Sequence, residues 1–116
     1  MARERYQAPE VPADELTPEF VRDELLRCFE SANQEFYEIL NQPITDEALR
    51  EQVRQFVTGV FQQCGASFEE PTKEEIRIAI DQCKANAEEM MGDQGAHVIL
   101  HHHDEMMKLV TRLPDG

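Results

Sequence analysis

The chain has 116 residues, which is enough for one hydrophobic core and too few for two. Its 24 acidic and 11 basic side chains give a net charge of −13, which disfavours binding to nucleic acids and to anionic membrane surfaces because both are themselves negative. No run of about 20 apolar residues and no signal-peptide pattern occurs, and the three cysteines do not pair up as a disulfide framework would require, so a cytoplasmic protein is expected.

Residues 1–16 contain two prolines, mixed charge and no sustained hydrophobic period. This composition predicts a disordered or loosely docked arm. Arg3, Arg5 and Tyr6 could instead form a linear motif that binds a partner, but a solvated tail is the simpler interpretation.

A first helix is predicted from Pro18 to about Leu40. Thr17 is placed as its N-cap, Pro18 suits the first helical position, and Leu16 is spaced to pack on Val21. The apolar residues that share one face at helical spacing are Val21, Leu25, Cys28, Phe29, Ala32, Phe36, Ile39 and Leu40.

A second helix is predicted from about Asp46 to Cys64, with Thr45 as the N-cap and Gly65 just after the end. Gly59, in the middle of this helix, costs about 1 kcal/mol relative to alanine. A close approach by another helix at Gly59 would explain that choice. The residues expected to be buried are Leu49, Val53, Phe56, Val57, Val60 and Cys64.

A third helix is predicted from about Lys73 to Met91, because Thr72 and Glu75 match the capping box that starts many helices. Its expected buried face comprises Ile76, Ala79, Ile80, Cys83, Ala87, Met90 and Met91.

The stretch 94–113 predicts a fourth helix, with Asp93 as the N-cap and Pro114 ending it. His102 and His103 fall within its apolar arc, and His101 falls outside it, one turn before a glutamate that it is expected to contact. A buried imidazole must find a hydrogen-bond partner or a metal, because an unsatisfied buried polar group costs about 1–3 kcal/mol.

Four amphipathic helices joined by short loops predict an all-α fold, namely an antiparallel up-down-up-down four-helix bundle over residues 17–113. The flexible N-terminal arm, residues 1–16, precedes the bundle, and residues 114–116 form a short tail.

The histidines and cysteines raise the possibility of a metal site. In such a bundle Cys28, Cys83 and His103 would lie at about the same height, about 15 Å from one end. These are ligands that zinc prefers, and His102 is the alternative imidazole, since adjacent side chains on a helix diverge by about 100°. Lone cysteines on apolar helix faces more often act as small core hydrophobes, so no cofactor is expected unless zinc occupies this site.

Signals for catalysis are weak. Glu35 and Glu38 have the Glu-x-x-Glu spacing found in helical enzymes that hydrolyse nucleotides with Mg²⁺, but the expected Glu-x-x-Asp companion is missing. The chain also lacks the Glu-x-x-His pairs of di-iron bundles and the His-Glu-x-x-His zinc motif. No catalytic residue is therefore assigned, and a protein without chemistry of its own is favoured.

Surplus apolar surface favours a role in interaction or assembly. Phe20 and Ile78 point away from the faces of their helices, and Leu26, Tyr37 and Leu100 broaden theirs beyond the width that a bundle needs. We therefore expect protein–protein interaction or homo-oligomeric assembly, with a homodimer as the simplest form. A zinc-binding regulatory bundle is the first alternative, and a Mg²⁺-dependent nucleotide hydrolase is the second.

Overall fold

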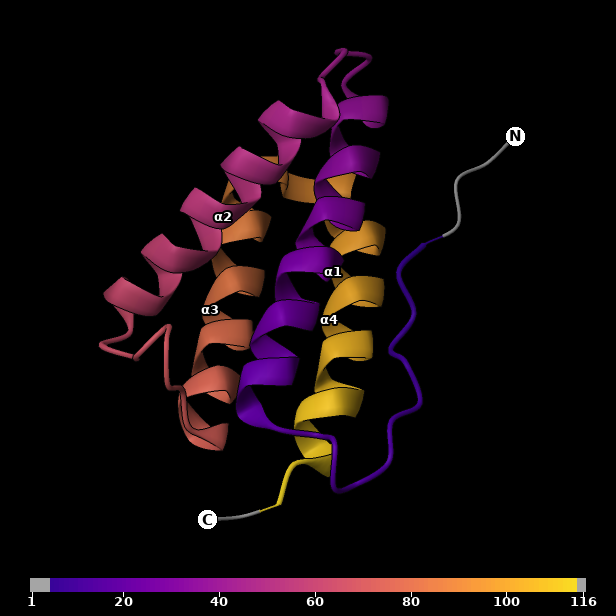
Figure 1. Ribbon diagram of the computed structural model, residues 1–116. Coiled ribbons are helices and arrows are strands. Elements are labelled where there is room, and N and C mark those ends of the chain that lie inside the picture. The colour runs from indigo at the N-terminus through magenta and orange to yellow at the C-terminus, as the bar shows by residue number, and fades with distance from the viewer. Residues whose placement is uncertain (1–4, 115–116) are drawn as a thin grey trace.

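The computed structural model describes residues 5–114, which form helices and no strand (Figure 1). The prediction of an all-α chain is confirmed. None of the helices in this range is long and apolar enough to cross a membrane. The elements are α1 (Pro18–Ile39), α2 (Asp46–Gln63), α3 (Lys73–Met91), the short 3₁₀ helix η1 (Gly92–Gly95) and α4 (Ala96–Arg112).

The starts of α1, α2 and α3 follow from local sequence. Thr17, Thr45 and Thr72 each accept, through the side-chain hydroxyl, a hydrogen bond from the backbone N–H three residues further on. Glu75 completes a capping box by accepting from the backbone N–H of Thr72. These bonds satisfy N–H groups that have no partner inside the helix, and the three predicted N-caps are confirmed.

The junction between α3 and α4 differs from the prediction. Asp93 does not cap α4 with its side chain; instead its backbone carbonyl accepts a hydrogen bond from the N–H of Ala96, within the 3₁₀ turn of η1. A Cβ added to the buried Gly95 would lie 2.7 Å from the Cβ of Met91 and 3.0 Å from the ring of Phe36. Glycine at this position therefore lets α4 follow α3 without an extended loop.

The helices pack around two apolar clusters. α1 and α3 both pack against α4, and α2 crosses obliquely against α1 and α3 (Figure 1). The main core includes the fully buried side chains of Leu25, Phe61, Ile76, Met106 and Leu109. A second cluster, nearer η1, consists of Ala32, Phe36, Ala87, Val98 and Ile99.

Two expectations for α2 are wrong. Gly59 is exposed, and a Cβ added there would meet no atom within 4 Å, so no neighbouring helix explains this glycine. Cys64 is the C-cap residue and only half-buried, and Phe56, another residue of the expected buried face, is half-buried as well. Phe61, which is not in the expected buried set, is completely buried.

The described part of the predicted arm, residues 5–16, runs beside α4 and turns back into α1 (Figure 1). Leu16 is buried in the main core, and Tyr6, Ala8 and Val11 pack against it. The proposed linear motif is only partly within this range, since Arg3 lies outside the described residues. The contacts of Arg5 and Tyr6 define the site below.

Candidate functional site

Side chains from α1 and α4 together bind the arm. We call this set the arm-binding surface, and it consists of Glu24, Ser31 and Glu35 of α1 with His101 and Glu105 of α4. On α1 the three polar residues recur at spacings of seven and four, which places them along one edge of the helix.

Arg5 and Tyr6 contact the α1 side of this surface. The Arg5 guanidinium donates through Nε to Glu35 at 2.9 Å and forms an ion pair with it. The hydroxyl of Tyr6 donates to Glu24 at 2.8 Å, and the backbone N–H of Tyr6 donates to the Ser31 hydroxyl oxygen at 3.1 Å.

The α4 side of the surface contacts the backbone of the arm. His101 donates from Nε2 to the carbonyl oxygen of Tyr6 at 2.9 Å, and the N–H of Ala8 donates to Glu105 at 2.9 Å. The expected contact between His101 and Glu105 is therefore replaced by bonds from both residues to the arm. Tyr6 is held at its N–H, its carbonyl and its hydroxyl at once.

Two carboxylates of the surface are buried. Glu24 is 6% exposed and Glu105 is 8% exposed. Burial alone would raise the pKa of Glu105, but hydrogen bonds from Lys108 and from the N–H of Ala8 outweigh it and hold the pKa below its usual value. The arm thus helps to keep Glu105 ionised.

The partner of Glu24 stays protonated. Burial, and then the hydrogen bond to Glu24, raises the pKa of the Tyr6 phenol well above its ordinary value. Tyr6 is therefore a permanent hydrogen-bond donor at this position.

Ser31 extends the network to His102, which is 4% exposed. The Nδ1–H of His102 donates to the Val98 carbonyl at 2.8 Å, so the neutral ring presents Nε2 as an acceptor for the Ser31 hydroxyl at 3.0 Å. Burial lowers the pKa of His102, which favours this neutral form. The chain of bonds from Tyr6 through Ser31 to His102 therefore joins the arm, α1 and α4.

The Ser31–His102 pair has the spacing of a nucleophile and its base, but its surroundings are those of a structural link. Ser31 lies inside α1, where neighbouring N–H groups are used in helical hydrogen bonds and cannot stabilise an oxyanion. Its oxygen already accepts from the N–H of Tyr6. The pair thus provides neither an open approach to the hydroxyl nor the donors that acyl transfer needs.

The four residues expected to hold a metal are only partly brought together. Cys28 lies beside α4 and its thiol donates to the carbonyl oxygen of His102 at 3.6 Å, and Cys83 is completely buried in the main core. His103 is half-buried and its Nε2 lies 3.0 Å from Asp81. Among residues 5–114, no group of three or more His, Cys, Asp or Glu side chains is arranged to hold a metal ion.

The thiols of Cys28 and Cys83 also stay protonated. Burial raises the pKa of both Cys28 and Cys83 well above the ordinary value. The pKa of each thiol is raised further by the proximity of another cysteine. A thiol must lose its proton to bind zinc, so these positions favour core packing.

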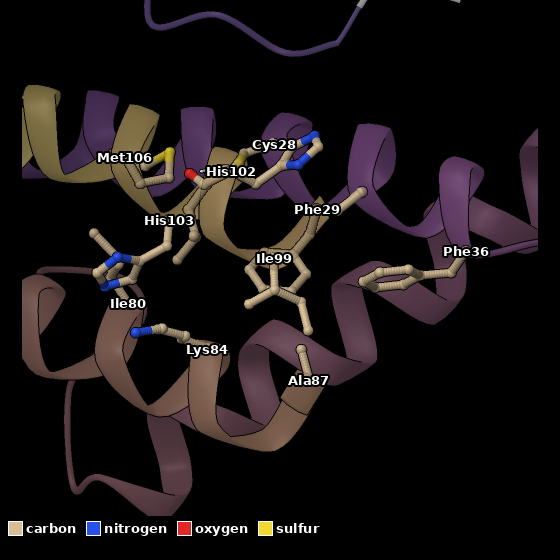
Figure 2. Close-up of a pocket in the computed structure, with 12 residues that line it drawn as sticks. Cys28, Phe29, Phe36, Ile80, Lys84, Ala87, Ile99, His102, His103 and Met106 are labelled. Atoms are coloured by element: carbon tan, nitrogen blue, oxygen red, sulfur yellow. Dashed lines mark hydrogen bonds between the residues drawn. The ribbon is translucent and has the colours of Figure 1, made fainter. Parts of the chain in front are cut away.

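A narrow cavity of about 20 Å³ lies between α1, α3 and α4 (Figure 2). Its walls are mostly apolar, with Phe29 and Ile99 among them, and Figure 2 shows Lys84 and His103 on one side and the ring of His102 directed away from His103. This volume accommodates about one water molecule, so as it stands the cavity is too small for an organic ligand.

Glu35 and Glu38, the residues of the Glu-x-x-Glu pattern, have different surroundings. Glu35 is paired with Arg5 on the arm-binding surface, and Glu38 is exposed at the end of α1. The arm therefore occupies the carboxylate that Mg²⁺ would need.

A second surface feature is apolar. The large hydrophobic side chains most open to solvent are Ile39, Leu40, Ile78, Met90 and Leu100. All of these except Ile78 lie where α1 and α3 end and α4 begins, and we call the four residues the apolar end.

The surplus apolar residues expected from the sequence are only partly exposed in this way. Ile78 and Leu100 are exposed, as expected. Phe20, Leu26 and Tyr37 are half-buried, and the first two pack against the main core.

Comparisons with protein-family models, with curated proteins and with solved structures found no match.

The sequence did not reveal the arm-binding surface, although it contained a signal. Glu24 follows Val21 by three residues and precedes Cys28 by four, so it continues the apolar face of α1 and had to be buried. Buried acceptors of this kind need donors. The donors come from a segment that shows no periodicity of its own.

Proposed function

We propose that the protein is a non-catalytic interaction protein that folds as an antiparallel four-helix bundle and associates with a second copy of itself. The observation that supports this proposal is the grouping of four exposed, large hydrophobic side chains at the apolar end. Isolated exposed hydrophobic residues are ordinary on monomers, but a group at one end is typical of a surface that another chain covers.

The charge around the apolar end opposes association. Glu38, Glu88, Glu89 and Asp93 are exposed in the same region, and the chain carries −13 overall. Two copies that meet here bring like charges together, so the dimer should tighten as salt screens the repulsion.

Sedimentation of the full chain at low and moderate salt tests this. We expect the dimer fraction to rise with salt at tens of micromolar protein, and we expect Leu100→Glu to reduce it strongly. Ile78→Glu is the matched control, because Ile78 is exposed on α3 away from the apolar end. A monomer at both salt concentrations, or equal effects of the two substitutions, would contradict the proposal.

A further inference from the structure

The geometry points to a peptide-binding site: we infer that the arm-binding surface recognises, in another polypeptide, an extended segment with an arginine directly before a tyrosine. In this view the chain's own residues 5–8 occupy the site and compete with the partner. The inference concerns a different surface from the apolar end, so it stands or falls independently of self-association through the apolar end.

The arm is held as an extended peptide ligand is held. Its main chain is bound at the N–H and carbonyl of Tyr6 and at the N–H of Ala8, and side chains supply the other two bonds. Main-chain bonds give affinity for any extended chain, whereas side-chain contacts select its sequence. Both elements of peptide recognition are present.

The selected residues follow from the surface. Glu35 is 16% exposed and accepts from a guanidinium, so it favours a cation in the first position. Glu24 is a buried acceptor for a hydroxyl at the end of a ring, so it favours tyrosine over phenylalanine in the second.

The arm leaves the surface soon after Tyr6. The last described hydrogen bond from the arm to this surface comes from Ala8, and the next residue is Pro9, which has no N–H to donate. A turn between Pro12 and Glu15 then returns the chain to α1. A partner segment without proline at this position could continue its main-chain contacts along α4, and in that way compete with the tethered arm.

The helices have hydrophobic contacts of their own, apart from the arm. Phe61, Ile76, Met106 and Leu109 are fully buried between helices, and the cluster around Phe36 forms without arm residues. The arm therefore covers a packed helical surface, which is the arrangement that allows one segment to be replaced by another.

The test uses the full-length chain with a weakened arm, Arg5→Ala with Tyr6→Phe, and a fluorescent peptide with the sequence of residues 3–11. Fluorescence anisotropy should show saturable binding to this variant. Binding to the unchanged chain should be at least tenfold weaker, because its own arm competes at a high effective concentration. A peptide in which phenylalanine replaces the tyrosine should bind at least fivefold more weakly.

Charge exchange identifies the site. Adding Glu35→Arg to the weakened-arm variant should weaken peptide binding at least tenfold. A peptide with glutamate in place of the arginine that corresponds to Arg5 should regain much of the lost affinity for this variant. Glu38→Arg is the matched control: it makes the same charge change one turn further along α1, at a residue for which the structure gives no contact with residues 5–16 of the arm. It should leave binding nearly unchanged.

Helicity by circular dichroism shows whether each variant is folded. If the double substitution unfolds the chain, Arg5→Ala alone serves as the weakened arm, because it leaves the Tyr6–Glu24 bond in place. Absence of saturable binding to a folded weakened-arm variant would overturn the inference. Equal losses with Glu35→Arg and Glu38→Arg would also overturn it, since they would reveal only nonspecific attraction.

Discussion

The Tyr6 hydroxyl and the Glu24 carboxylate, 18 residues apart in sequence, form a 2.8 Å hydrogen bond that attaches the arm to α1. Glu24 is 6% exposed, and Arg27 lies 3.7 Å from its other oxygen. Arg27 is largely exposed, so water screens its ion pair with Glu24. The hydrogen bond from Tyr6 to Glu24 is therefore the shorter and better shielded of the two contacts of Glu24.

Tyr6→Phe should lower the free energy of unfolding by about 1–3 kcal/mol, because it leaves a buried acceptor without its donor. Urea unfolding followed by circular dichroism measures the change. Tyr37→Phe is the control: its hydroxyl donates to Gln52 at 2.9 Å on the exposed side of the molecule. That change should stay within about 0.5 kcal/mol. Similar effects of the two substitutions would show that the buried Tyr6–Glu24 bond contributes no more to the free energy of unfolding than the exposed Tyr37–Gln52 bond.

The sequence predicted what is local and missed what depends on distant contacts. Thr72 and Glu75 are three residues apart, so a capping box could be recognised directly. The bond from Ala8 to Glu105 joins residues 97 apart, and no period or motif encodes it. The prediction that Asp93 caps α4 was wrong for a related reason. The choice between a side-chain cap and a 3₁₀ turn depends on how tightly Gly95 packs on α1 and α3.

The candidate metal residues illustrate the same division. Helical periodicity correctly placed Cys28 and Cys83 on buried faces. It could not show that His102 would bond with both ring nitrogens to Val98 and Ser31, because the second bond depends on how α1 packs against α4.

Cys64 should react with a thiol reagent in the native protein well before the other two cysteines. It is half-buried at the end of α2, whereas burial raises the pKa of the Cys28 and Cys83 thiols and leaves little thiolate. We expect one fast thiol per chain, and two more on denaturation. Cys64→Ser should remove the fast phase, and its persistence in that variant would mean that a core cysteine is accessible.

Zinc should leave the melting temperature unchanged relative to chelator. Both ring nitrogens of His102 have protein partners, and the thiols of Cys28 and Cys83 resist losing the proton that metal binding requires. Thermal unfolding with one equivalent of Zn²⁺ and with chelator provides the comparison. A rise in melting temperature that disappears in Cys83→Ser would restore the zinc site.

Two glycines should respond to alanine in opposite directions. Gly59→Ala should raise the free energy of unfolding by about 0.5–1 kcal/mol, because it adds helix propensity where nothing obstructs a methyl group. Gly95→Ala should lower it by about 1–3 kcal/mol, because the new Cβ would lie 2.7 Å from the Cβ of Met91. Urea midpoints measure both. A destabilising Gly59→Ala would indicate that a chain not included in this structure packs on α2.

The contribution of His102 to the free energy of unfolding should fall between pH 7.5 and 5.5. Burial, with His101 and Arg5 nearby, lowers its folded-state pKa, although the bond to Val98 and the charge of Glu35 oppose the shift. Below the ordinary value of 6.5 the unfolded chain therefore binds more protons at this residue than the folded chain. The contribution is complete above that value and declines as the pH falls towards the folded-state pKa.

Glu105 does not interfere in this range. Its pKa is held below 4.5 in the folded state, so the stability that it contributes is lost only in more acidic solution. His102→Gln removes the titrating group, and His97→Gln makes the same change at an exposed residue in the first turn of α4. The change in the urea midpoint from pH 7.5 to pH 5.5 should be less negative in His102→Gln than in the unchanged chain. In His97→Gln this change should equal that of the unchanged chain. If both substitutions leave the shift as it was, protonation of His102 does not limit stability in this range.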